Sequence, residues 1–374
     1  MENFDAKGQI VFIEPRWVTG ETCLFNINNK IDYAYAKGKV TKIRKEFIQK
    51  LEDEGFIITY DKNYNEDEVV SFIMNDQSVC DDNKDTAYFK KEFDKIIFNS
   101  GGKNFYFPKT VRMEEFLKNP FYPVVMKNEI MNAGIDKFLI ETPEQLEIIK
   151  KFYNDFKDKD TYKEVFDCTI FQELIETPTN FKTYMRVLMS ASGDVMGASL
   201  KYSEIGIQRR EASGLYEKYF WNPKSEYYLN CSGMFNYYSG GGEIYFNQPR
   251  YGDRTKKILT AHGIDPLNPK IPSQILEVAG NIAQKCNKQL GIMCGIDFIY
   301  NEKDNNWYYL EVQAFPAVDE WLVQNGQKKM KVGNVDNYIK CLAIETEVRH
   351  EALKLYVNKK EKNQETPKKY ELKS

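Results

Sequence analysis

Apolar and polar residues alternate in two segments near the C-terminal end of the chain. Residues 293–300 read Met-Cys-Gly-Ile-Asp-Phe-Ile-Tyr, and residues 307–313 read Trp-Tyr-Tyr-Leu-Glu-Val-Gln. Both segments are rich in the aromatic and β-branched residues that favour strands. The polar link between them, Asn301 to Asn306, has the composition of a hairpin loop. The pattern therefore predicts an antiparallel hairpin.

The register of this hairpin decides which side chains meet. If Asp297 lies opposite Glu311, then Tyr300 lies opposite Tyr308. A five-residue loop, Glu302 to Asn306, then remains between the strands, and this is an ordinary length for a hairpin loop.

In that register, two carboxylates and one amide converge on one surface. They belong to Asp297, Glu311 and Gln313, because residues two apart on a strand share a face. Oxygen ligands on rigid strands suit a hard cation, most naturally Mg²⁺ held together with substrate phosphates. The alternative is a half-exposed hairpin whose polar face meets water. The apolar and aromatic residues around Glu311 favour the metal site, because a buried carboxylate is usually paired or metal-bound.

The N-terminal part of the chain predicts an open parallel sheet. A strand from Gln9 to Glu14 is followed by an amphipathic helix from Thr41 to Glu54 and a strand from Phe56 to Tyr60, with a further strand expected at Ile96 to Asn99. Strand, helix and strand at this spacing are typical of a parallel α/β unit. We assign residues 1–107 to this N-terminal α/β domain.

The next part of the chain alternates short strands with loops and helices. A strand ends at Lys127 and is followed by a loop from Asn128 to Asp136. The segment Thr142-Pro143-Glu144-Gln145 has the pattern of a helix start, with a capping threonine, a proline in the first turn and glutamine at the third position. With another strand at Ile170 to Ile175, residues 108–178 are expected to form a small sheet-based lobe.

The rest of the chain is expected to form a larger lobe, residues 179–349, that contains the metal-binding hairpin. Its other expected elements are a hairpin of residues 181–189 and 195–202, a helix at 272–290 and a last helix at 335–349. The aromatic segment from Tyr216 to Tyr251 is a candidate lining for a substrate pocket, because pockets favour aromatic walls. The tail, residues 350–374, is rich in Lys, Glu and Gln and is expected to be partly disordered.

The composition of the chain excludes several classes of protein. The chain has 374 residues and a net charge of −3, which gives no electrostatic reason to expect nucleic acid or a membrane as partner. No apolar run approaches the roughly 20 residues of a membrane span, and the N-terminus has no signal-peptide pattern. The seven cysteines are scattered singly and there are two histidines, so neither a disulfide framework nor a His-rich metal site is indicated. We expect a cytoplasmic α/β protein.

The order of these parts resembles the ATP-grasp superfamily, over roughly Pro108 to Ala317. The matching residues are Lys127 at a strand end, the strand Gln172-Glu173-Leu174-Ile175, a hairpin with Lys182, Arg186 and Lys201, and the motif Asp297…Glu311-x-Gln313. The resemblance implies an ATP-grasp fold, in which an N-terminal α/β domain precedes two sheet-based lobes that sandwich ATP.

The resemblance also implies a role for each matching residue. The nucleotide would be bound by Lys109, Lys127 and Lys182 and by the backbone of Gln172, Glu173, Leu174 and Ile175. The catalytic cations near the phosphates or the acyl group would be Arg186, Lys201 and Arg209. The alternative for Arg186 is an ion pair within the sheet, with Glu173 or Glu176. One or two Mg²⁺, with Mn²⁺ as an alternative, would be held by Asp297, Glu311 and Gln313.

Two features depart from the family pattern. The last motif is usually Glu-x-Asn, whereas Gln313 ends it here, and its longer stem changes the ligand geometry. The loop after Lys127 has one glycine, Gly134, where the family often has several. The earlier nucleotide-binding lysine of the family has three candidates, which are Lys95, Lys103 and Lys109.

The expected function is an ATP- and Mg²⁺-dependent ligase that joins a small-molecule or peptide carboxylate to an amine or thiol acceptor. The reaction would pass through an acyl phosphate and release ADP and phosphate. Two alternatives remain open. One is an ATP-grasp kinase that phosphorylates a hydroxyl, to which Lys201, Arg209 and Arg210 would supply basic groups, and the other is a non-catalytic nucleotide-binding scaffold, which the Gln313 departure favours. A homodimer is an open alternative to a monomer.

Overall fold

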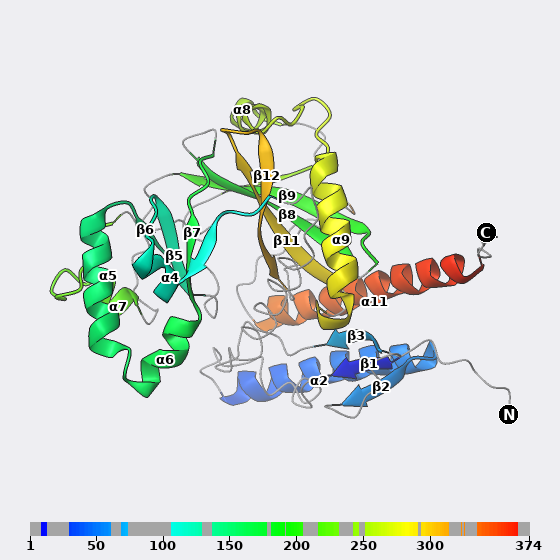
Figure 1. Cartoon of the computed structure of the whole chain (residues 1–374). Helices are drawn as coiled ribbons and strands as arrows, with labels where there is room; N and C mark the ends of the chain where they lie inside the picture. Colours follow the sequence, from blue (N-terminus) through cyan, green and yellow to red (C-terminus); the bar gives the residue numbers. More distant parts are fainter. Residues whose placement is uncertain are drawn as a thin grey trace, which may run out of the picture.

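Three sheets organise the part of the chain that the structure describes (Figure 1). In this computed structural model the described residues are 9–12, 30–60, 69–73, 106–128, 137–177, 181–190, 192–204, 216–231, 242–246, 251–290, 293–313, 323, 325 and 335–365. A three-stranded sheet lies near the N-terminus, and a four-stranded and a five-stranded sheet follow along the sequence. Among the described residues, no helix is long and apolar enough to cross a membrane.

The N-terminal sheet is parallel, as the strand–helix–strand pattern predicted. Its elements are β1 (Gln9–Phe12), α2 (Lys30–Asp53), β2 (Ile57–Tyr60) and β3 (Val69–Ile73), and β1 lies between β2 and β3. Helix α2 begins well before the expected Thr41, and β3 was not predicted. The strand predicted at residues 96–99 lies outside the described residues.

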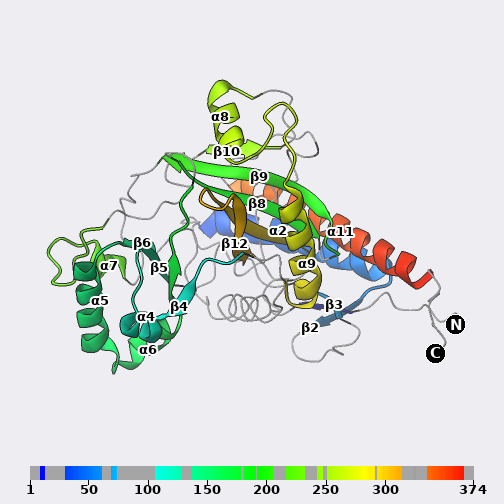
Figure 2. The same ribbon diagram turned by 45° about the horizontal axis from the view of Figure 1, so that its top comes forward.

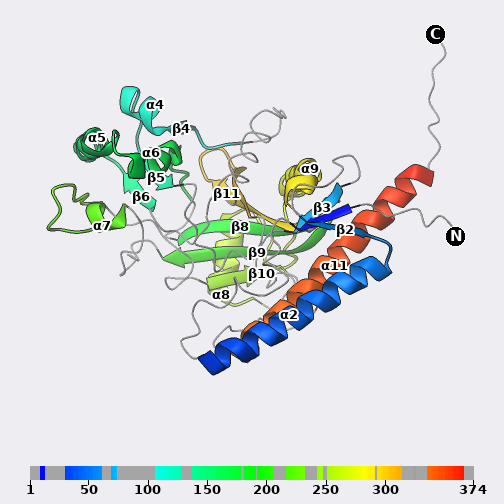
Figure 3. The same ribbon diagram turned by 90° about the horizontal axis from the view of Figure 1, so that it is seen from below.

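A long C-terminal helix, α11 (Val335–Glu365), lies beside α2 (Figure 3). One buried apolar cluster joins it to the N-terminal sheet and helix, and its members include Ile10, Phe47, Leu51, Val348, Ala352 and Leu353. The helix continues through residues 350–365, where the sequence predicted a partly disordered tail. Lys, Glu and Gln are good helix formers, and the apolar residues at the start of this stretch give the helix a core to pack against.

The second sheet is antiparallel, and helices cover one of its faces. Its strands are β4 (Thr110–Arg112), β5 (Val124–Asn128), β6 (Lys137–Ile140) and β7 (Thr169–Glu173), in the order β4-β7-β5-β6. The helices of this small lobe are α4 (Met113–Lys118), α5 (Pro143–Phe156), α6 (Asp160–Asp167) and α7 (Glu217–Phe220). The predicted helix start is confirmed, because Thr142 and Gln145 form a capping box at the N-terminus of α5.

The first part of the aromatic segment belongs to the core of the small lobe. Tyr216, Phe220 and Tyr227 are buried, and their ring centroids lie 5.9, 5.0 and 5.1 Å from that of Phe152 on α5. These three side chains are enclosed in the core and so do not line a substrate pocket, and for the rest of the aromatic segment that role stays a prediction. Their aromatic surface is instead used in packing, where ring pairs at such distances are favourable.

The third sheet is antiparallel and runs in the order β10-β9-β8-β11-β12. Its strands are β8 (Phe181–Ser190), β9 (Val195–Glu204), β10 (Gly242–Tyr245), β11 (Met293–Asn301) and β12 (Asn306–Gln313). Helix α9 (Ser273–Leu290) lies across one face of this sheet, and α8 (Asp253–Ala261) lies near its β10 edge (Figure 2). Val187, Ile282 and Ile296 belong to the buried core between the sheet and these helices.

The predicted hairpin is present, and its register is confirmed at the residues that matter for the site. Asp297 lies opposite Glu311. Beyond this pair, a β-bulge shifts the register by one residue, so that Tyr300 faces Trp307 and not the predicted Tyr308. The loop is consequently shorter than predicted, because Asn306 already belongs to β12. A bulge adds one residue to one strand only, which the alternation of side chains does not reveal.

Candidate functional site

A row of side chains crosses the five strands of the large sheet on the face opposite α9. In register from one edge to the other, the row consists of Glu311, Asp297, Arg186, Ser199 and Tyr245. Residues directly opposite each other on antiparallel strands share a face. Since neighbouring residues along the strands, such as Ile296 and Val187, point into the apolar core, this row occupies the other face.

Arg186 and Asp297 form the centre of the row. Arg186 Nε donates to Asp297 Oδ1 and Arg186 Nη2 donates to Asp297 Oδ2, both at 2.7 Å. The side chains are only 8% and 4% exposed. Burial raises the pKa of the Asp297 carboxyl, and the Arg186 charge opposes that rise. Such a bidentate pair fixes both side chains, because the planar guanidinium matches the carboxylate.

This pairing joins two residues for which different roles were predicted. Arg186 was expected near the phosphates and Asp297 at the metal, and in the structure they bind each other. The alternative for Arg186 was an ion pair with Glu173 or Glu176. The buried partner that the structure shows is Asp297. The partners lie 111 residues apart in the sequence, so no local pattern indicated them.

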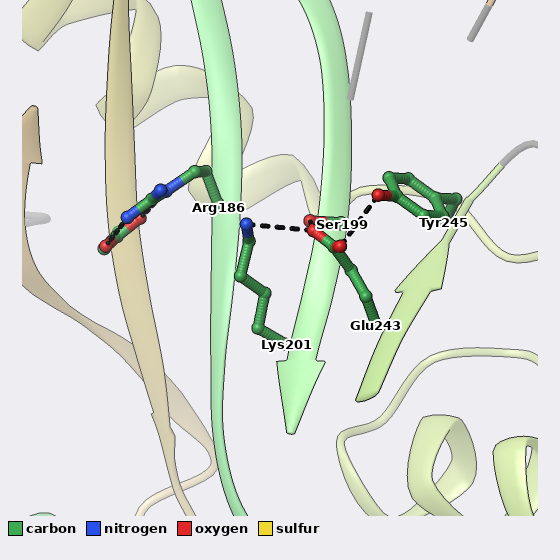
Figure 4. Close-up of polar contacts among 6 residues, drawn as sticks. Arg186, Ser199, Lys201, Glu243 and Tyr245 are labelled. Atoms are coloured by element: carbon green, nitrogen blue, oxygen red, sulfur yellow. Dashed lines mark hydrogen bonds and ion pairs between the residues drawn. The ribbon is translucent and has the colours of Figure 1, made fainter. Parts of the chain in front are cut away.

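A second buried ion pair lies beside the first. Lys201 Nζ is 2.9 Å from Glu243 Oε1, and both side chains are 5% exposed. Ser199 Oγ donates to the same oxygen at 2.9 Å, and Tyr245 OH donates to Glu243 Oε2 at 2.7 Å (Figure 4). Sequence analysis missed Glu243, Ser199 and Tyr245. The one available signal was an acidic residue inside the alternating segment Gly-Glu-Ile-Tyr at the end of the glycine run.

Asp297 and Glu311 are the acidic groups available for a cation. Their Cα atoms are partners across β11 and β12, and the Glu311 charge contributes to raising the pKa of Asp297. Gln313 lies opposite Gly295, two residues along β12 from Glu311, and its side chain is outside the described residues. The described residues contain no group of three or more His, Cys, Asp or Glu side chains that could hold a metal. Two carboxylates that face each other across a hairpin are the kind of oxygen ligand that a hard cation prefers, and the metal-binding role of Asp297, Glu311 and Gln313 stays a prediction.

The small sheet places Lys127 on the face away from its helices. Met126 and Phe171 point into the aromatic core, so Lys127 and Gln172 point the other way. Lys127 is 8% exposed, and its Nζ donates to Gln172 Oε1 at 2.9 Å. Gln172 Nε2 in turn donates to Thr110 Oγ1 at 3.1 Å. The structure thus brings together two of the residues that were expected to bind the nucleotide.

The predicted hinge strand makes its hydrogen bonds within the small lobe as far as Leu174. The N–H of Glu173 donates to the C=O of Lys109 at 2.8 Å, and that of Leu174 donates to the C=O of Pro123 at 3.1 Å. The Lys109 ammonium lies over the Phe121 ring, 4.0 Å from its centroid. The N–H groups of Glu173 and Leu174 are therefore already used inside the small lobe, and the role of residues 172–175 in binding adenine stays a prediction.

Several predicted site residues lie where the structure gives no side-chain description. They are Arg209 and Arg210, the side chain of Lys182 on β8, the loop from residue 129 to 136, and the early lysines Lys95 and Lys103. Their expected roles stay predictions.

No protein-family model matches the sequence, and no curated protein sequence matches it. Three of the solved structures that resemble this chain are enzymes or enzyme domains. D-alanine–D-alanine ligase from Bacillus anthracis, complexed with ATP, is 10% identical with a TM-score of 0.38, covering 93% of this chain and 99% of the ligase. The ATP-grasp ligase PsnB, complexed with a minimal precursor, is 11% identical with a TM-score of 0.37, covering 90% and 80%.

The third is the biotin carboxylase domain of 2-oxoglutarate carboxylase from Hydrogenobacter thermophilus, complexed with MgADP and bicarbonate. It is 15% identical with a TM-score of 0.37, covering 90% of this chain and 69% of that chain. Superposition at this level does not by itself assign a function. The order of parts that the sequence predicted is present among the described residues, with a parallel N-terminal sheet followed by two antiparallel sheets and their helices.

Proposed function

We propose that the chain is an ATP- and Mg²⁺-dependent ligase that joins a carboxylate to an amine or a thiol. The observation that carries the proposal is the buried row on the large sheet, in which Arg186 grips Asp297 and Glu311 stands opposite Asp297. Taking ions out of water costs several kcal/mol each, so stability is a weak explanation for a buried ion pair. A row with one cation and two carboxylates is suited to a ligand that brings phosphates and a metal ion together.

Phosphoryl transfer requires positioning and charge neutralisation more than it requires covalent catalysis. Lys127 on the small sheet and Arg186 and Lys201 on the large sheet supply the positive charges. Asp297, Glu311 and Gln313 would hold Mg²⁺, which neutralises phosphate charge when bound. The phosphates would compete with Asp297 for Arg186, so the internal pair is expected to loosen when the nucleotide binds.

The reaction follows from these groups in two displacements. An oxygen of the substrate carboxylate attacks the γ-phosphorus of ATP, the bond to the bridging oxygen breaks, and ADP leaves with that electron pair. The amine nitrogen then attacks the acyl carbon of the acyl phosphate, phosphate departs, and the amine gives up a proton to phosphate or water. Exclusion of water from the acyl phosphate prevents its hydrolysis.

Neither His262 nor Cys231 is placed for covalent catalysis. His262 is buried between Thr183 Oγ1 and the C=O of Ile258, at 2.5 and 2.6 Å, in the core beneath the large sheet. Burial raises the pKa of the Cys231 thiol to about 11, whereas a nucleophilic cysteine needs a lowered pKa. Activation is therefore proposed to occur on the substrate.

The test is a product analysis with ATP, Mg²⁺, excess hydroxylamine and a panel of carboxylates. The proposal predicts a hydroxamate and ADP, and it predicts that Asp297→Asn forms neither. AMP with pyrophosphate would mean adenylation and would refute the mechanism. ADP with a stable phosphorylated alcohol would indicate the kinase, and nucleotide binding without any turnover would indicate the scaffold.

A further inference from the structure

A carboxylate on the edge strand β10 has no part in the reaction as proposed so far. Glu243 lies one register row from the Arg186–Asp297 pair, opposite Lys201. Three donors hold its carboxylate: the Lys201 ammonium and the Ser199 hydroxyl at Oε1, and the Tyr245 hydroxyl at Oε2 (Figure 4). Hydrogen bonds to an ionised group are about twice as strong as neutral ones, so this carboxylate is firmly fixed.

We infer that Glu243 is a positioning residue, which holds the Lys201 ammonium beside Arg186 on the polar face of the large sheet. The inference rests on the proposed function, in which Lys201 would contact a phosphate or the acyl group from this position. Glu243 itself acts through Lys201 and does not touch the reacting atoms.

The register shows how the placement arises. The backbone of Lys201 lies in the row of Tyr184 and Glu243, whereas Arg186 and Ser199 lie in the next row. Glu243 Oε1 accepts from both Lys201 and Ser199, so the carboxylate reaches across the two rows and takes the ammonium with it. Figure 4 shows the Lys201 side chain running along the sheet toward Ser199 and Arg186.

Lys201 lies in the row next to Arg186 and Asp297 on the same face of the sheet. The bond to Glu243 Oε1, which also accepts from Ser199, directs the Lys201 ammonium toward that row. The ammonium carries three N–H donors, so it can keep its bond to Glu243 while it donates to a ligand.

Stability alone is a weak explanation for such an arrangement. Replacing a buried ion pair by well-packed apolar residues is often neutral or stabilising. The Glu243 carboxylate also has two hydroxyl donors, Ser199 and Tyr245, on neighbouring positions of the same face. These hydroxyl donors add little to the stability that a simple ion pair gives. They do fix the orientation of the Glu243 carboxylate.

The test compares Glu243→Gln with Glu147→Gln in the full-length protein. The control makes the same change in an exposed pair on α5, where Glu147 lies 2.8 Å from Lys150. The first measurement uses no nucleotide: an amine-reactive ester labels the protein, and mass spectrometry gives the labelling rate of Lys201. Loss of charge-assisted bonds predicts a rate about tenfold higher in Glu243→Gln and unchanged in the control.

The second measurement is the affinity for an ATP analogue with Mg²⁺. Glu243→Gln and Lys201→Met should each weaken binding by the same factor, about tenfold. The double variant should bind no more weakly than Lys201→Met alone, because Glu243 acts through the lysine. Unchanged labelling of Lys201, or losses that add, would overturn the inference. A wild-type protein that binds no nucleotide would overturn the proposed function, and labelling would then decide the placement of Lys201 by itself.

A milder variant keeps the test valid if Glu243→Gln does not fold. Tyr245→Phe removes one hydroxyl donor from the carboxylate and leaves the charge in place. The labelling rate of Lys201 should then rise by about threefold, as the loss of one hydrogen bond predicts. An unchanged rate in this variant would also count against the inference.

Discussion

The small and the large antiparallel sheets both carry buried polar side chains, but these side chains are paired in different ways. Each is covered by helices on one face and presents polar side chains on the other. On the small sheet, the hydrogen bonds that begin at Lys127 run through neutral groups, the Gln172 amide and the Thr110 hydroxyl. On the large sheet, the bonds join ions, Arg186 to Asp297 and Lys201 to Glu243.

This difference between the two sheets predicts which substitutions will lower both stability and activity. Loss of the hydrogen bond from Lys127 leaves a neutral Gln172 oxygen without its donor, whereas removal of one member of a buried ion pair leaves the other charge uncompensated. Substitutions on the large sheet should therefore damage both stability and activity, and substitutions on the small sheet should damage mainly ligand binding.

The largest effect is expected for Asp297→Asn on the large sheet. The variant loses the negative charge that balances Arg186 and would face Mg²⁺. Breaking a buried pair costs about 3–5 kcal/mol, and loss of turnover by at least about a thousandfold corresponds to roughly 4 kcal/mol of barrier. Urea unfolding and the hydroxamate assay measure the two losses.

The matched control is the double variant Arg186→Met/Asp297→Leu, which replaces both ions by apolar side chains. Its free energy of unfolding should return to within about 1 kcal/mol of wild type, because neither charge remains buried. Its turnover should stay absent. Recovery of turnover, or an Asp297→Asn protein with turnover within about tenfold of wild type, would remove the catalytic role from the row.

A smaller effect is expected for Lys127→Met on the small sheet. The free energy of unfolding should change by only about 1 kcal/mol, the cost of leaving the Gln172 oxygen without this donor. Affinity for an ATP analogue with Mg²⁺ should fall by about ten- to a hundredfold. The control is Lys163→Met on α6, an exposed lysine of the same lobe. A large loss of stability with intact affinity would reverse the comparison between the sheets.

Gln313 offers a graded test of the metal site. Gln313→Asn keeps an amide oxygen and should change turnover by less than about tenfold, whereas Gln313→Leu removes the oxygen and should lower it by more than that. The Mg²⁺ concentration needed for half-maximal turnover should rise in Gln313→Leu. Equal behaviour of the two variants would show that this amide does not bind the metal.

The smallest effect concerns pH and the apolar side of the large sheet. Burial lowers the pKa of His262 from 6.5, so the unfolded chain binds its proton more readily than the folded one. Stability from this residue is present above pH 6.5 and falls as pH drops toward the folded-state pKa, by at most about 1.4 kcal/mol per pH unit. Urea unfolding at pH 8 and pH 5.5 should show this fall in wild type, and His262→Gln should show less of it. An identical pH dependence in both proteins would contradict the assignment.

Local patterns predicted the parts of the fold that depend on local sequence. The capping box at Thr142 and Gln145 and the facing of Asp297 and Glu311 were predicted because each depends on spacing within one segment. The bulge beyond Asp297 was missed, because an inserted residue leaves the composition of a strand unchanged. The extension of α11 to Glu365 was missed because charged residues suit both a helix and a disordered tail.

The sequence predicted several residues of the candidate site, but it did not predict which of them contact each other. Asp297 was chosen from the strand pattern, and Arg186 and Lys201 were chosen from the resemblance, but their partners come from strands distant in sequence. Glu243 was not chosen at all, since its significance depends on Lys201, which becomes its neighbour only when β9 and β10 pair. Such contacts form only when strands that are distant in sequence pair in a particular register. Local patterns in a single sequence do not predict that pairing.

The most direct test of the account asks whether both sheets bind the same nucleotide. Calorimetric titration with a non-hydrolysable ATP analogue and Mg²⁺ should give clear binding to the wild-type protein. Binding should be weakened by at least about tenfold in Lys127→Met and also in Arg186→Met/Asp297→Leu, while Lys163→Met binds as wild type does. No heat with wild-type protein, or a loss confined to one of the two sheets, would contradict the claim that they act together on ATP.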